Sequence, residues 1–119
     1  MTAHFIQRLA RISTPFAVLA LIILSWLPGT ERPHTGLAGQ VEHFIAYTLT
    51  AAGIVIGFPH RIQTVALMLI GLNAVLEVGQ IWIPGRTSQF IDFAASCGGI
   101  VLGLFAGYSI VRLWLARTL

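Results

Sequence analysis

The sequence predicts an all-α protein, a bundle of four transmembrane helices with short loops and with both termini in the cytoplasm. Composition is the first observation: 56% of the 119 residues are hydrophobic and 9% are charged, against about 25% charged in soluble proteins. Second, four apolar stretches approach the roughly 20 residues that a helix needs to cross a bilayer. Third, the arginines are distributed unevenly among the connecting segments. Together these observations predict an integral membrane protein.

The first apolar stretch, residues 12–27, is the shortest and follows Arg8 and Arg11. A signal peptide has a similar charged start and apolar centre. No convincing cleavage site follows this stretch, however, and Pro28-Gly29 indicates a helix end and a turn. We therefore interpret it as the first span.

Three longer stretches follow, and short segments that contain proline or glycine separate them. The expected spans are 41–58, 62–83 and 90–115, and the expected connectors are 28–39, 59–61 and 84–88. Connectors of this length leave no room for a second domain. The whole chain, 1–119, is therefore expected to form one domain.

Arginine placement predicts the orientation. Five arginines lie on one side of the expected spans, and two lie on the other: Arg8, Arg11, Arg61, Arg112 and Arg117 against Arg32 and Arg86. The positive-inside rule places the first side in the cytoplasm. Trp26 and Trp82 then fall near the outer interface and Trp114 near the inner one, as an aromatic belt predicts.

Composition also excludes several classes of function. The basic residues are scattered singly, without the patch of a nucleic-acid-binding protein. A single cysteine, Cys97, cannot form an internal disulfide. No cofactor is indicated, and the expected partner is the lipid bilayer. The oligomeric state is left open.

Polar residues gather in the outer half of the expected bundle. Glu77 lies inside the third span, where a charged group costs roughly 2.5–3.5 kcal/mol and normally faces a polar partner or a cavity. Residues three, four and seven apart share a helix face, which groups the polar side chains of spans two to four. The candidate site residues are Glu42, His43, Tyr47, Glu77, Gln80, Arg86, Asp92 and Ser96.

The fourth span carries a line of small residues below Asp92 and Ser96, namely Gly99, Gly103 and Gly107. Small residues at this spacing let helix backbones approach closely in lipid. Since Asp92 and Ser96 continue the glycine line, we expect both to point into the bundle.

These motifs resemble those of the VanZ-like family of bacterial integral membrane proteins, over about residues 24–107. The resemblance is carried by Glu42-His43-Phe44-x-x-Tyr47, Leu76-Glu77-x-x-Gln80, Pro84-Gly85-Arg86-x-Ser88-x-x-Asp92 and Gly99-x-x-x-Gly103. Family members often have an asparagine where this chain has Ser96 or Cys97. The resemblance implies the bacterial cytoplasmic (inner) membrane and the cell envelope. The family's named member is associated with low-level resistance to the glycopeptide teicoplanin.

Two interpretations of the polar cluster stay open. In one, the cluster is an extracytoplasmic site that binds or modifies the headgroup of an envelope lipid or cell-wall precursor. Glu77 and His43 would exchange protons there as catalytic residues, and Arg86 would hold a phosphate or carboxylate. In the other, the protein is a non-catalytic structural or accessory protein whose polar residues only hold the helices together. The sequence does not decide whether it is an enzyme.

Three further interpretations are disfavoured. One histidine with scattered acids lacks the spacing of a metal site, and Arg86 would compete by charge, so no metal is expected. A hydrolase triad of Ser88, His43 and Asp92 lacks a nucleophile elbow. Ion transport would need ionisable residues that continue from Glu77 into the inner half.

Overall fold

The computed structural model describes residues 2–27, 36, 39–83 and 90–117. Most of two expected connectors, with Arg32, Arg86 and Ser88, lies outside these described residues. Four long α-helices make up the described part, and a short 3-10 turn follows two of them. The elements are α1 (Ala3–Trp26), α2 (Gly39–Gly57), α3 (Ile62–Gly79), η1 (Gln80–Trp82), α4 (Phe90–Leu113) and η2 (Leu115–Arg117).

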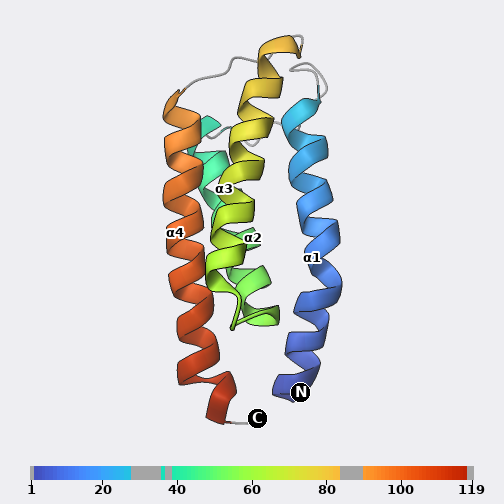
Figure 1. Ribbon diagram of the computed structural model, residues 1–119, viewed down its shortest axis with the longest axis vertical. Helices are drawn as coiled ribbons and strands as arrows, with labels where there is room; N and C mark the ends of the chain where they lie inside the picture. The colour runs from blue at the N-terminus through green and yellow to red at the C-terminus, as the bar shows by residue number, and fades with distance from the viewer. Residues whose placement is uncertain (1, 28–35, 37–38, 84–89, 118–119) are drawn as a thin grey trace.

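The helices run alternately up and down along the long axis of the molecule, so both ends of the chain lie at the same end of the bundle (Figure 1). The prediction of an all-α bundle is confirmed. By length and composition, three helical segments could cross a membrane: Ala3–Trp26, Ile62–Trp82 and Phe90–Leu113. The α2 helix is not among them, because its first two turns carry Gln40, Glu42 and His43.

The α1 helix begins nine residues before the expected first span. Thr2 caps it, since its hydroxyl accepts a hydrogen bond of 3.2 Å from the Phe5 N–H. Pro15 lies inside this helix and cannot donate a backbone hydrogen bond. The hydroxyls of Ser13 and Thr14 both donate to the Ala10 carbonyl in the preceding turn. Hydropathy alone could not show this extension, because Arg8 and Arg11 interrupt the apolar pattern.

The closest packing in the bundle is between α2 and α4. A Cβ built on Gly99 would lie 2.5 Å from the Phe44 carbonyl oxygen, and one on Gly107 would lie 2.7 Å from that of Ala52. Gly103 faces the Thr48 carbonyl oxygen still more closely. The predicted glycine line therefore faces another helix, and that helix is α2.

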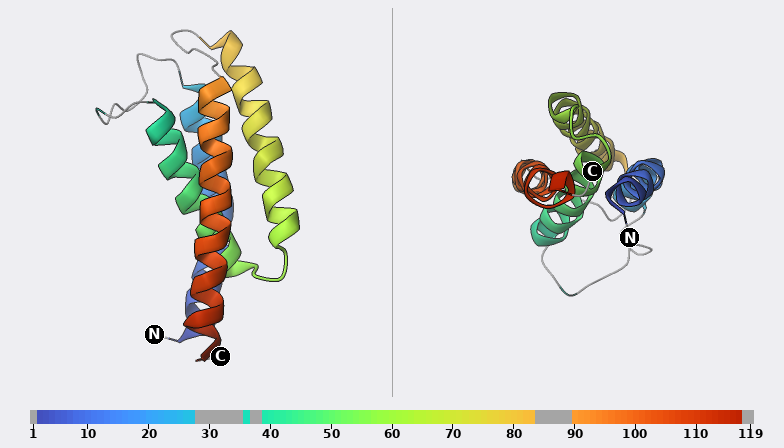
Figure 2. Two further views of the ribbon diagram at one scale, coloured as in Figure 1. Left: turned by 90° about the vertical axis from the view of Figure 1, so that its left-hand side faces the viewer. Right: turned by 90° about the horizontal axis from the view of Figure 1, so that it is seen from below.

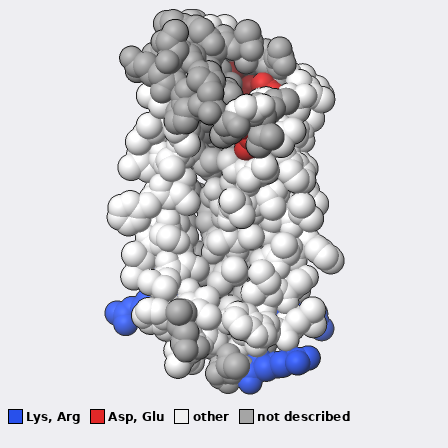
Figure 3. Space-filling view, turned by 180° about the vertical axis from the view of Figure 1, so that it is seen from behind, with Lys and Arg blue, Asp and Glu red and all other residues white. Residues whose placement is uncertain are grey.

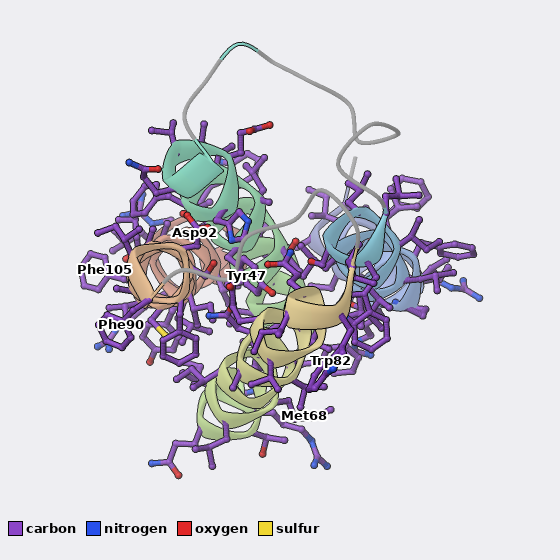
Figure 4. The ribbon with its side chains drawn as sticks, turned by 90° about the horizontal axis from the view of Figure 1, so that it is seen from above. Tyr47, Met68, Trp82, Phe90, Asp92 and Phe105 are labelled. Carbon is purple, nitrogen blue, oxygen red and sulfur yellow. The ribbon has the colours of Figure 1, made fainter. Side chains whose placement is uncertain are left out.

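The core lies along α2, where the side chains of Ala51 and Val55 are inaccessible, as is that of Ile100 on α4. Large apolar side chains cover the outside instead. Phe90 and Phe105 point away from the bundle axis, and Phe105 is 74% exposed (Figure 4). Views along two further directions show the C-terminal part of α2 between the other helices and its N-terminal part beside α4 at the edge of the bundle (Figure 2). An apolar exterior around a packed helix bundle is what a lipid environment favours.

The charged residues that the structure describes lie toward the two ends of the molecule (Figure 3). In the face shown in Figure 3, the basic residues lie at the end that holds the termini, and the acidic residues lie at the opposite end. A broad uncharged band separates them. The described acids are Glu42, Glu77 and Asp92, and the described arginines are Arg8, Arg11, Arg61, Arg112 and Arg117.

Candidate functional site

The up-and-down topology explains why residues far apart in sequence meet. The first turns of α2 and α4 and the last turn of α3 all lie at the end opposite the termini (Figure 1). His43 lies near the start of α2, Glu77 near the end of α3, and Asp92 and Ser96 in the first two turns of α4. We call these four residues the acid–histidine cluster.

His43 is at the centre of the cluster. Its Nδ1 atom lies 3.4 Å from Glu77 Oε1 and 3.2 Å from Ser96 Oγ. One ligand atom from each of His43, Glu77 and Asp92 falls within 4.8 Å of the others. A protonated Nδ1 can donate to the Glu77 carboxylate, and a bare Nδ1 can accept from the Ser96 hydroxyl. The cluster can therefore hold a proton in more than one position.

Burial differs across the cluster. Ser96 is fully buried, and the Glu77 side chain is 8% exposed. The His43 side chain is 17% exposed, and Asp92 is partly exposed. Within the acid–histidine cluster, burial is therefore greatest at Ser96 and Glu77 and lower at His43. In Figure 4, Asp92 lies between α2 and α4, on the side that faces the bundle interior.

Two helix starts add positive electrostatic potential at this end. Glu42 lies in the first turn of α2, and Asp92 lies in the first turn of α4. The N-terminal turn of a helix carries a partial positive charge that stabilises nearby carboxylates. Gly39, the first residue of α2, is also close to Asp92: a Cβ there would lie 3.8 Å from Asp92 Oδ1. Both helix starts therefore favour anionic groups at this end of the bundle.

A second set of polar contacts surrounds the cluster and joins helices through backbone carbonyls. Asn73 Nδ2 donates to the Phe93 carbonyl at 3.3 Å and lies 3.8 Å from Cys97 Sγ, which ties α3 to α4. Gln80 Nε2 donates to the Ser25 carbonyl at 2.9 Å, which ties η1 to α1. These side chains hold the ends of the helices together, whereas the cluster brings ionisable groups together.

Trp26 makes a contact that sequence reasoning missed. Its indole N–H donates to the Leu76 carbonyl at 3.2 Å, and its ring lies against Gly79, where a Cβ would approach to 2.6 Å. We expected Trp26 to anchor the helix at the membrane interface. The one signal in the sequence was Gly79, near the end of the third span, because a glycine there leaves room for a large side chain from another helix.

The predicted site residues have different places in the structure. His43, Glu77, Asp92 and Ser96 are brought together. Tyr47 is buried nearby and interacts electrostatically with the Glu77 carboxyl. Gln80 faces α1 through its side-chain amide, and Glu42 is partly buried in the first turn of α2. Arg86 lies outside the described residues, so its ion pair with Asp92 stays a prediction.

The donor set of the cluster suits two kinds of chemistry. An imidazole beside carboxyl groups can take up and release protons near neutral pH. The same three groups are ligand types that a divalent cation such as Zn²⁺ accepts. Their sequence spacing does not predict a metal site, but the fold brings them within reach of a common ion.

Comparison with protein-family models found no match, and neither did searches of curated proteins and of solved structures.

Proposed function

We propose that this chain is a four-span protein of the bacterial cytoplasmic membrane, and that its acid–histidine cluster binds the phosphate-containing headgroup of a lipid-linked envelope precursor at the extracytoplasmic face. The observation that carries the proposal is the meeting of His43, Glu77, Asp92 and Ser96 at one end of an otherwise apolar bundle. Isolated ionisable groups are costly in a membrane, and a group of them marks a functional site by default. The proposal assigns binding and proton exchange, and it assigns no chemical reaction.

Support for the orientation comes from the distribution of charge. The described arginines lie at the end that holds the termini, and the cluster lies at the other end (Figure 3). The positive-inside rule would place the arginine end in the cytoplasm. Both termini would then be cytoplasmic, and the cluster would face the layer where lipid-linked envelope precursors present their headgroups.

Support for α2 as a fourth span comes from its position. It runs parallel to α4 and packs closely against it along the line of Gly99, Gly103 and Gly107. His43, which lowers its apolar character, has partners on both α3 and α4. A polar side chain that has partners on neighbouring helices costs less in a membrane than one without them.

The proposed binding mode divides the work among the site residues. His43 is partly exposed and would contact the headgroup. Glu77 is more deeply buried and would exchange a proton with the headgroup through the His43 imidazole. Arg86 would pair with the phosphate, as Arg commonly does. Tyr47, Gln80 and Glu42 would shape and support the site.

The VanZ-like resemblance rests on the residue motifs alone, since no family model matches the chain. It agrees with an envelope location, and it would connect the protein to processes that glycopeptides such as teicoplanin affect. A role in glycopeptide resistance rests on this resemblance alone.

A non-catalytic structural role is the second candidate, and a specific observation favours it. Four side-chain hydrogen bonds at this end join two different helices or their extensions, through Trp26, His43, Asn73 and Gln80. Such contacts average about 0.6 kcal/mol each in membrane bundles. Their sum could hold the helix ends without any ligand.

Replacing Glu77 by Gln separates the two candidates, because the amide keeps the size of the side chain and removes its exchangeable acid proton. We would purify wild type and Glu77→Gln and measure the binding of polyprenyl phosphate by native mass spectrometry, together with thermal stability. A binding site predicts a roughly tenfold or greater loss of bound lipid, because Glu77 no longer stabilises a protonated His43 that donates to the phosphate, and one hydrogen bond to a charged group contributes about this much. Asn73→Ala is the control, since it removes a bond between helices outside the cluster.

The structural role predicts a different pattern. Both variants would lower thermal stability, and neither would change lipid binding relative to wild type. Equal binding by wild type and Glu77→Gln at normal abundance would rule out Glu77 as part of a headgroup site.

A further inference from the structure

An apolar groove of about 610 Å³ lies between α1 and α3, and its lining reaches from Arg61 to Val75. Val18 contributes from α1, Ile54 and Phe58 from α2, and Leu72 and Val75 from α3. The α1 and α3 helices meet at Trp26 and Leu76, and the lining of the groove ends next to that contact, at Val75. Pockets for small molecules typically measure about 300–1,000 Å³, so this groove is large enough to retain one.

The groove matches one leaflet of a bilayer in length. Its α3 wall runs from Thr64 to Val75, about 16 Å along the helix axis at about 1.5 Å per residue. The hydrocarbon layer is about 30 Å thick, so one leaflet measures about 15 Å. An acyl chain of the leaflet on the arginine side would therefore run along the whole groove.

One end of the groove is basic. Arg61 lines both the groove and an adjoining polar hollow of about 600 Å³, which also includes His60, Gln63 and Tyr108. Arg11 lies at the same end, where its guanidinium is 5.6 Å from the centre of the Phe58 ring and its Nε donates to the Gly57 carbonyl. Two cations thus flank the point where the groove meets the hollow.

No described carboxylate competes for these arginines, because all described acids lie at the opposite end. Basic pockets between transmembrane helices bind anionic lipid headgroups. A zwitterionic lipid could fill the groove equally well, but it would gain less from Arg61 and Arg11. The site would therefore distinguish lipids by the charge of their headgroups.

We propose that the α1–α3 groove binds an anionic glycerophospholipid, with one acyl chain in the groove and the phosphate at Arg61. This site is independent of the proposed function of the acid–histidine cluster. Its headgroup end, at Arg61, lies at the other end of the bundle, and the groove is lined by none of the cluster residues.

Two glycines provide a matched pair of variants. Gly71 lines the groove, and a Cβ added there meets nothing within 4 Å, so Gly71→Leu would fill the groove without a backbone clash. Gly53 on α2 has the same open surroundings and is outside the groove, so Gly53→Leu is its control. Arg61→Ala would remove the headgroup cation. Its control is Arg112→Ala, which removes an exposed arginine on α4.

The test is native mass spectrometry of the detergent-purified full chain with equal amounts of phosphatidylglycerol and phosphatidylcholine. We expect about fivefold more bound phosphatidylglycerol, the preference that one basic residue near a membrane surface provides. Arg61→Ala should abolish the preference, and Gly71→Leu should reduce binding of both lipids. Both control variants should behave as wild type. Arg61→Gln replaces Arg61→Ala if the latter does not fold.

Several outcomes would overturn the proposal. Equal binding of the two lipids by wild type would show that the charge of the headgroup does not contribute to recognition. Unchanged lipid binding by Gly71→Leu would show that the acyl chain does not occupy the groove. Displacement of the lipid by inorganic phosphate would show that the acyl chain contributes nothing to the affinity. Loss of the preference in Arg112→Ala would show that net charge, and not this site, selects the lipid.

Discussion

Helical phase predicted which residues of the third and fourth spans point into the bundle and join the acid–histidine cluster. Glu77 appeared as an acid in an apolar stretch, and Asp92 and Ser96 continued a line of glycines, so each had to point inward. The structure places them around His43, whose Nδ1 is 3.4 Å from Glu77 Oε1 and 3.2 Å from Ser96 Oγ. Their partners could not be predicted in detail, because helical phase gives the direction of a side chain but not which helix it faces.

Gln80 shows the limit of phase arguments. It lies three residues after Glu77, so the sequence grouped the two on one face. The helix tightens to a 3-10 turn at Gln80, and the side chain donates to the Ser25 carbonyl on α1. A change in helix type rotates later residues relative to the ideal α-helix, and the sequence does not signal this change.

A double-mutant cycle on His43→Ala and Ser96→Ala should show a coupling free energy of about 1 kcal/mol. The two side chains share a 3.2 Å hydrogen bond, and such contacts in membrane proteins contribute up to about 1.7 kcal/mol. The measurement is unfolding in mixed micelles. The control cycle pairs Ser96→Ala with Asn73→Ala, whose described bonds go to Phe93 and Cys97, and its coupling should be near zero.

At the scale of elements, the glycine line of α4 controls how closely α2 can approach. The small-residue spacing predicted that this face packs against another helix, and the structure identifies the partner as α2. The sequence could not identify it, because any neighbouring helix could have met the glycines. Only Phe44, Thr48 and Ala52 of α2, spaced four residues apart, present their carbonyls along this line.

Gly103→Leu should destabilise the bundle by about 1–3 kcal/mol, the usual range for overpacking. Its Cβ would meet the Thr48 carbonyl and the Ala51 side chain, and a backbone carbonyl cannot move aside cheaply. Unfolding in mixed micelles measures the effect. Gly53→Leu is the matched control, since a Cβ there meets nothing within 4 Å. Equal stability of the two variants would contradict close α2–α4 packing.

At the scale of the whole molecule, polarity is arranged in three layers: arginines, an apolar band and the acid–histidine cluster (Figure 3). The arginine pattern predicted this arrangement, and the described residues follow it. Three helical segments are long and apolar enough to cross a membrane. The fourth span and the direction of insertion stay predictions, because the fold alone does not define which end of the bundle faces the cytoplasm.

Cysteine labelling tests the orientation. In a Cys97→Ser background, Gln40→Cys would report the cluster end and His60→Cys the arginine end, and both positions are exposed. An impermeant maleimide added to intact spheroplasts should label Gln40→Cys and leave His60→Cys unlabelled until the membrane is opened. The reverse pattern would place the acid–histidine cluster in the cytoplasm and end the proposal of an extracytoplasmic site.

The polar contacts that α2 makes with later helices have a consequence for biogenesis. Its first turns carry Gln40, Glu42 and His43, and the described partners of His43 are on α3 and α4, which are synthesised later. When α2 leaves the ribosome, it has only α1 beside it, and lipid is a poor solvent for its polar turns. We therefore expect α2 to insert inefficiently by itself and to depend on translation of the chain through α4. Such a protein completes its topology after synthesis of its last helix.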